Sequence, residues 1–80
     1  MKAKIFISLK EGILDPQGST VNKALDSVGI DSINSIRMGK YIEMEFNSKD
    51  KDQISSIVKK SCNKLLVNPN TETYTFSIED

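Results

Sequence analysis

The residues whose side chains could do chemistry are few in this 80-residue sequence: Cys62 is the only cysteine, and there is no histidine. The commonest general base and metal ligand are therefore missing, as are the Cys and His sets that hold zinc. Cys62 falls in an apolar helical pattern, which predicts a buried core residue rather than a catalytic thiol. A single cysteine also excludes an internal disulfide framework. We therefore expect neither a catalytic residue nor a metal site.

The acidic pair Glu43 and Glu45 lies on one face of a predicted strand. Two such carboxylates could serve glycosidase-like or metal chemistry. The pattern favours a solvated strand face beside lysines, because no further oxygen ligand is singled out.

Arg37, Lys40 and Tyr41 cluster around Gly39, in a turn where Gly39 is predicted to supply a positive φ. The cluster has three interpretations: an interaction surface, an ordinary solvated turn, or a phosphate contact at the tip of a hairpin. The Gly-Lys pair is no nucleotide-binding loop by itself, because the longer glycine-rich string is absent.

Composition excludes several kinds of partner. Eleven Lys and Arg balance eleven Asp and Glu, so the formal charge is zero. Neither nucleic acid nor a membrane surface is expected as a partner, because both select an excess of basic residues. No apolar run reaches the length of a membrane span and no signal peptide is visible, so a cytoplasmic location is expected. A chain this small that has no disulfide or structural metal often gains stability by association, which predicts a homo-oligomer.

The elements that would position these residues follow from hydrophobic periodicity. Alternation of apolar and polar residues predicts strands over residues 2–10, 31–37, 41–46 and 72–78, although both faces of 31–37 carry an isoleucine. Helices are predicted over residues 16–28 and from Asp50 to the stop at Asn68-Pro69. The order β-α-β-β-α-β over a single domain, residues 1–80, indicates an α+β fold with two layers. Both helices would cover one face of a mainly antiparallel sheet.

Both predicted helices carry an apolar stripe. Gly29 is expected to close the first helix in a left-handed conformation. The stripe residues are Val21, Ala24, Leu25 and Val28 in the first helix, and Ile54, Ile57, Val58, Cys62, Leu65 and Leu66 in the second. On the opposite face of the sheet, Phe6 is either a partly covered aromatic under lysine stems or a subunit contact.

The string Leu14-Asp15-Pro16-Gln17-Gly18 turns the first strand into the first helix. Asp15 is a good N-cap, and Pro16 suits the first helical position. Gly18 allows the backbone to pass close to a neighbour. Capping needs only Asp15 and Pro16, so the rest of the string suggests docking as well as capping.

This string resembles the PurS family, the small subunit of phosphoribosylformylglycinamidine synthase. The resemblance continues at residues 37–43 (Arg-Met-Gly-Lys-Tyr-Ile-Glu) and at residues 62–69 (Cys-Asn-Lys-Leu-Leu-Val-Asn-Pro). It covers essentially the whole chain. Departures are Asn70-Thr71, where relatives tend to have an apolar pair, and Val67 in place of the more usual Ala.

The resemblance implies a non-catalytic accessory subunit of an ATP- and glutamine-dependent carbon–nitrogen ligase in purine biosynthesis. Such a chain would form a homodimer or homotetramer. It would bridge a large PurL-like synthetase and a PurQ-like glutaminase, and support ammonia transfer between them. ATP and Mg would belong to the synthetase, with no cofactor in this chain. The docking candidates carried over are Leu14, Asp15, Pro16, Gln17, Gly18, Arg37, Gly39, Lys40 and Tyr41.

A second hypothesis uses the same order of elements. A stand-alone, dimeric ferredoxin-like domain could bind a small regulatory metabolite at its subunit boundary, since fold does not fix function. An anion site around Lys40 would be its signature.

Overall fold

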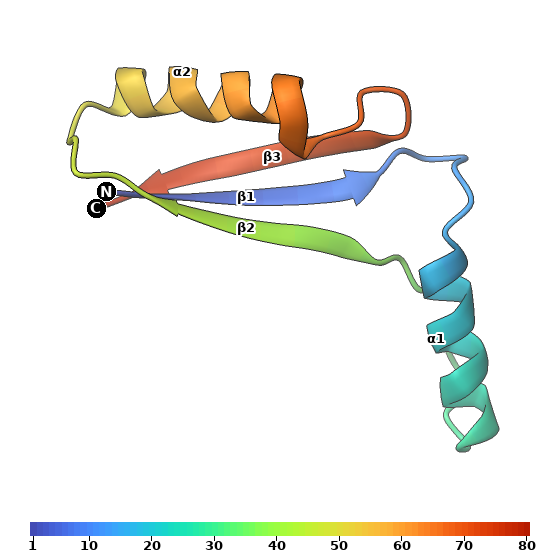
Figure 1. Cartoon of the computed structure of the whole chain (residues 1–80). Helices are drawn as coiled ribbons and strands as arrows, with labels where there is room; N and C mark the ends of the chain where they lie inside the picture. Colours follow the sequence, from blue (N-terminus) through green and yellow to red (C-terminus); the bar gives the residue numbers. More distant parts are fainter.

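The computed structural model describes all residues, 1–80, as three strands and two α-helices, the second continued by a short π-helix (Figure 1). The elements are β1 (Lys2–Leu9), α1 (Pro16–Ser27), β2 (Gly39–Glu45), α2 (Lys51–Ser61), η1 (Cys62–Leu66) and β3 (Glu72–Glu79). The α+β class and the antiparallel sheet are confirmed. The number of strands and the place of α1 differ from the prediction.

The sheet has the order β2-β1-β3, with both pairs antiparallel. Ile5 of β1 lies opposite Ile42 of β2 and Phe76 of β3, so these apolar side chains share one face. Phe6 lies opposite Tyr41 and Thr75 on the other face. The helix α2 lies across the first face only (Figure 1), which leaves the second face of the sheet open.

The core forms between β1 and α2 together with η1. Its buried residues are Ala3, Ile5, Ile7, Ile54, Val58, Cys62 and Val67. The prediction that Cys62 is a core residue is confirmed, since its side chain is fully buried. Asp50 caps α2 by accepting hydrogen bonds from the backbone N–H groups of Asp52 and Gln53, which confirms the predicted start of this helix.

The turn after α2 is wider than an α-helical turn. The backbone N–H of Val67 donates to the carbonyl of Cys62 at 3.1 Å, the five-residue spacing of a π-helix. The extra residue rotates Leu65 out of the apolar stripe, and its side chain is 83% exposed. The prediction that Leu65 lies in the core face was therefore wrong, because it assumed 3.6 residues per turn throughout.

The helix α1 does not cover the sheet. It projects from the end where β1 stops and β2 starts, and Gly18 is its only buried residue (Figure 1). Gly29 ends it with φ of +92°, as predicted. The molecule is consequently elongated, 48 by 27 by 15 Å. We call residues 16–38 the arm, and the sheet with α2 and η1 the body.

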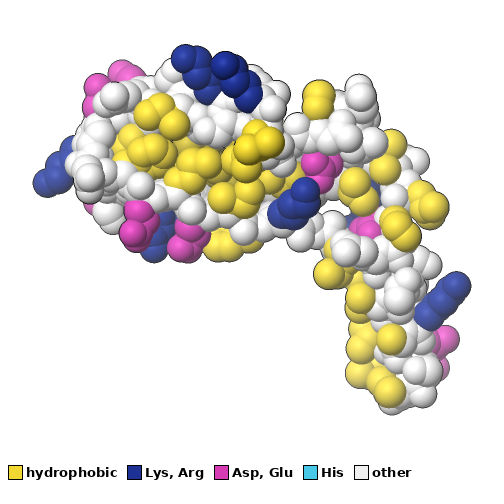
Figure 2. Space-filling model, in the orientation of Figure 1, with side chains coloured by type: hydrophobic (Ala, Val, Ile, Leu, Met, Phe, Trp, Pro, Cys, Tyr) yellow, Lys and Arg dark blue, Asp and Glu magenta, His cyan; other side chains and the backbone are white.

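The sheet does not cover the apolar stripe of the arm, in which Val21 and Leu25 are half-buried and Ala24 and Val28 are exposed. Figure 2 shows hydrophobic side chains along one side of the arm, where no part of the body covers them. Val28 is 72% exposed and Ile30 48%. The prediction that both helices pack on one face of the sheet is corrected to α2 alone.

Residues 31–37 form no strand, contrary to the prediction. Their physical setting explains this. The chain returns from the far end of α1 and runs beside that helix. Most of the segment therefore lies past the end of the strands and cannot pair with them (Figure 1). Its alternation is weak because both of its faces carry apolar residues.

Candidate docking site

The carboxylate of Asp15 joins the arm to the body. Its Oδ1 accepts a hydrogen bond from the backbone N–H of Gly18 at 2.9 Å, which is the predicted N-cap. Its Oδ2 accepts from the backbone N–H of Met38 at 2.7 Å. One buried side chain therefore ties the first turn of α1 to the residue that precedes β2.

Arg37 adds the end of β1 to this connection. Its guanidinium donates to the carbonyl oxygens of Leu9 and Lys10, both at 3.1 Å. Its Nε lies 3.8 Å from Oδ2 of Asp15. The end of β1 and the start of α1 thus meet the distant residues 37 and 38 at two side chains. We call this set, with Gly18, Ile36 and Met38, the joint.

Two glycines permit the close approach of backbones at this end of the sheet. A Cβ on Gly18 would lie 2.1 Å from the carbonyl oxygen of Ile36, and one on Gly39 would lie 2.6 Å from that of Ile7. Neither position accommodates a side chain without moving backbone. The predicted positive φ of Gly39 was wrong: Gly39 begins β2 opposite Ser8, and its requirement is space.

The joint holds a negative charge rather than a proton donor. The N–H of Gly18 lowers the pKa of Asp15 most, the N–H of Met38 next, and Arg37 adds to the effect. Asp15 is therefore ionised at neutral pH. Its two oxygens are committed to structural partners, which fits a positioning role and not acid–base chemistry.

A cavity of about 110 Å³ adjoins the joint and brings the two glycine-containing strings together. Asp15 and Gln17 line it from one string, and Gly39 and Lys40 from the other. Glu72 of β3 completes the wall, with its Oε2 3.5 Å from Nζ of Lys40. Leu14, Pro16 and Gln17 are exposed around the start of α1, and the side chain of Leu14 is 81% exposed. The predicted docking candidates thus lie largely at the end of the body where the arm begins.

Tyr41 lies apart from this group, on the open face of the sheet. Its ring lies 4.9 Å, centroid to centroid, from that of Phe6, and both side chains are about half exposed. The Tyr41 hydroxyl donates to Oε1 of Glu43 at 2.7 Å, and this bond raises the pKa of Tyr41 to about 12. Phe6 is therefore a half-exposed aromatic paired with Tyr41 on the open face of the sheet.

Glu43 and Cys62 do not form reactive centres. The hydrogen bond from Tyr41, followed by the charge of Lys2, lowers the pKa of Glu43. Its Oε2 lies 3.6 Å from Nζ of Lys2. Burial raises the pKa of the Cys62 thiol, which disfavours the thiolate. No group of three or more His, Cys, Asp or Glu side chains is placed to hold a metal ion.

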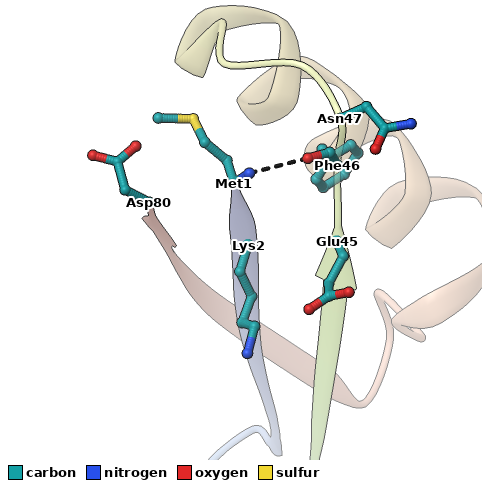
Figure 3. A pocket seen from close by; sticks show the side chains of 6 residues that line it. All are labelled: Met1, Lys2, Glu45, Phe46, Asn47 and Asp80. Atoms are coloured by element: carbon teal, nitrogen blue, oxygen red, sulfur yellow. Dashed lines mark hydrogen bonds between the residues drawn. The ribbon is translucent and has the colours of Figure 1, made fainter.

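A hollow at the other end of the sheet contains residues that the sequence did not single out. It is lined by Met1, Lys2, Glu45, Phe46, Asn47 and Asp80. The amino group of Met1 donates to the carbonyl of Phe46 at 3.0 Å, and the labelled side chains do not converge on one point (Figure 3). The side chains around this hollow lie at the end of the sheet and do not form a group that could act together in catalysis.

Ile36, Met38 and Glu72 lie at this same end of the body and were not among the predicted docking candidates. Ile36 and Met38 contribute through backbone groups, which leave no signature in residue type. Glu72 had a signal, because it starts β3 and its charge is opposite to that of Lys40.

No helix of this chain is both long enough and apolar enough to cross a membrane.

The family model for PurS, described as phosphoribosylformylglycinamidine (FGAM) synthase, matches residues 2–80.

Solved structures agree with this match. PurS of Bacillus subtilis is 42% identical, with a TM-score of 0.87 over 99% of this chain and 98% of that one. PurS of Methanocaldococcus jannaschii, described as one of the subunits of formylglycinamide ribonucleotide amidotransferase in the purine biosynthetic pathway, is 31% identical. Its TM-score is 0.87 over 98% of this chain and 94% of that one. A chain in the structure of PurLQS from Thermotoga maritima is 33% identical, with a TM-score of 0.84 over 95% and 93%. The chain belongs to the PurS family.

Proposed function

We propose that this chain is the small accessory subunit of a phosphoribosylformylglycinamidine synthase in purine biosynthesis. The observation that carries the proposal is the match to PurS over residues 2–80, together with the similarity to a chain of the Thermotoga maritima PurLQS structure. The enzyme would convert formylglycinamide ribonucleotide, ATP and glutamine to formylglycinamidine ribonucleotide, ADP, phosphate and glutamate. The metabolite-binding alternative is not favoured, because the matching structures are synthase subunits.

Within such an enzyme the chain acts by assembly rather than by chemistry. A PurL-like synthetase subunit supplies the ATP and Mg site, and a PurQ-like subunit releases ammonia from glutamine. This chain holds the two in register in the cytoplasm and supports the passage of ammonia between them. The joint fits that role, since it fixes a projecting arm at a set angle through Asp15 and Arg37.

The arm supports self-association into a homodimer or homotetramer. Its apolar side chains cover no part of the body; Val28 is largely exposed and Ile30 about half exposed. Covering them with a second copy would remove apolar surface from water, at about 25 cal/mol per Å².

Reconstitution tests the proposed function. The three purified subunits are mixed, glutamine-dependent amidine formation is measured against ammonia-dependent formation, and light scattering gives the size of the complex. We expect the glutamine-dependent rate and the larger particle to require this chain. Asp15→Ala and Lys40→Ala should reduce both, whereas Lys49→Ala, an exposed lysine between β2 and α2, should not. Equal glutamine-dependent rates with and without the chain would contradict the proposal.

A further inference from the structure

Positive charge is concentrated on the second half of α2 and on η1. The chain has no net charge, yet no acidic residue occurs between Asp52 and Glu72. That interval contains Lys59, Lys60 and Lys64, all exposed. Figure 2 shows Lys and Arg side chains gathered on the outer side of the body, over α2. Charge balance over the whole sequence therefore conceals a local basic surface.

The three lysines have no partner within the chain. All four ion pairs of the structure lie elsewhere, and none of these lysine ammonium groups donates a hydrogen bond to another residue. The cations of those four pairs are Lys2, Lys4, Arg37 and Lys40. Lys59, Lys60 and Lys64 are thus free to meet charges from outside.

The helical repeat places two of these three lysines, Lys60 and Lys64, on the same side of the helix. Ile57, Lys60 and Lys64 are three and four residues apart and so share one side of the helix. The π-helical turn rotates Leu65 toward that side and leaves it 83% exposed, while Ile57 is 39% exposed. We call these four residues the α2 patch. Lys59 points to a different side.

The α2 patch has a composition that helix stability alone does not require. Basic residues in the last turn complement the helix dipole, which accounts for Lys59 and Lys60. It does not account for Leu65, since an α-helical turn would place that side chain in the core face. π-Helical turns often occur at functional sites, and an exposed leucine beside unpaired lysines is suited to a protein contact.

We propose that the α2 patch docks an acidic protein surface, in which an apolar recess receives Leu65 and Asp or Glu side chains surround it. This acidic surface belongs to one of the two larger subunits, an assignment that rests on the proposed function. Charge complementarity favours such a partner over a contact of the patch with itself, because a two-fold axis through the patch would set lysines against lysines.

The test measures binding of this chain to each purified larger subunit separately, by titration calorimetry at low and at high salt. The variants are the double substitution Lys60→Glu with Lys64→Glu, the single Leu65→Ser, and the control Lys59→Glu. The control reverses one lysine charge on the neighbouring residue of the same helix, which is half the charge change of the double variant. Thermal unfolding checks each variant for folding, and light scattering checks its self-association.

We expect the double variant to bind one larger subunit at least about tenfold more weakly at low salt, with less loss at high salt. Leu65→Ser should weaken binding about tenfold through lost apolar burial. Lys59→Glu should stay within about threefold of the unaltered chain. Equal affinities of the unaltered chain and the double variant would overturn this inference and leave the proposed function standing. A change in self-association in the double variant would also overturn it, and no binding to either subunit would overturn both.

Discussion

The body and the arm are held in place by different physical interactions. In the body, seven buried apolar residues fill the space between the sheet and α2 with η1. The arm has no such core; a carboxylate, a guanidinium and a close backbone approach fix its root. Apolar burial is non-directional, whereas hydrogen bonds specify an angle. The body is thus built for stability, and the arm for orientation with its apolar side left available.

The largest expected difference comes from the same substitution made in each region. Val58 is fully buried in the body, and Val28 is 72% exposed in the arm. Val58→Ala should lower the free energy of unfolding by about 2 to 3 kcal/mol, through lost burial and the cavity left behind. Val28→Ala should change it by less than about 0.5 kcal/mol.

Urea unfolding of the two variants, at a concentration where the chain is monomeric, makes this comparison. Sedimentation at higher concentration should then show weaker self-association for Val28→Ala alone. Similar losses of stability for both variants in the monomer would mean that the arm packs on the body in solution.

The next effect is expected at the joint, from Gly18→Ala. Replacing glycine within a helix normally stabilises it by roughly 0.5 to 1 kcal/mol. Here the new Cβ would lie 2.1 Å from the carbonyl oxygen of Ile36, so the two segments must separate. Hydrogen exchange should become at least about tenfold faster in the arm and stay unchanged in the body.

Ser19→Ala is the matched control, because Ser19 is the next residue of the same helix and is exposed. It should leave exchange unchanged or slightly slower. Protection of the arm that survives Gly18→Ala would show that the close contact with Ile36 does not hold the arm.

The two regions also differ in how much of them the sequence predicts. Period-two alternation in β1 and the helical stripe around Ile54, Val58 and Cys62 are confirmed, because each buried face repeats at the spacing of its own element. The cap at Asp15 and the end of α1 at Gly29 are confirmed for the same reason: they depend on neighbouring residues.

What could not be predicted depends on contacts between distant residues. The stripe of α1 has the period of a helix that covers a sheet, yet periodicity does not say which surface covers it. The hydrogen bond between Asp15 and the N–H of Met38 joins residues 23 positions apart through a backbone group. The rotation of Leu65 arises from one π-helical turn, which residue type does not reveal.

A smaller effect should separate the two N-cap aspartates. The carboxylate of Asp50 accepts only from the N–H groups of Asp52 and Gln53, within its own helix. Asp15 also accepts from Met38, in another segment. Asp50→Ala should therefore speed hydrogen exchange in the first turn of α2 alone. Asp15→Ala should speed it severalfold both in the first turn of α1 and around Met38.

Exchange measured by mass spectrometry on overlapping peptides resolves these segments. An effect of Asp15→Ala confined to the first turn of α1 would reduce Asp15 to an ordinary cap and remove the joint from the comparison.

The smallest expected effect is the acid dependence of the joint. Hydrogen bonds from Gly18 and Met38, and the charge of Arg37, lower the pKa of Asp15 below its ordinary value of 3.8. A carboxyl group with a lowered pKa in the folded state stabilises that state fully above its unfolded pKa. The contribution is lost as the pH falls through the lower, folded pKa. The arm should therefore stay fixed at pH 5 and loosen only below about pH 3.8, where Asp15 takes up a proton.

Nuclear magnetic resonance can follow this step at the two amides that donate to Asp15. The amide protons of Gly18 and Met38 should shift together, with one midpoint below 3.8, while amides of the buried strand β1 stay constant over that range. Asp15→Asn removes the titrating group and should abolish the common midpoint. If the two amides titrate with different midpoints, or at 3.8 and above, the two hydrogen bonds do not share one ionised carboxylate. The arm would then be oriented by Arg37 and the Gly18 contact instead, and the contrast between a packed body and an arm fixed by charge would lose its central residue.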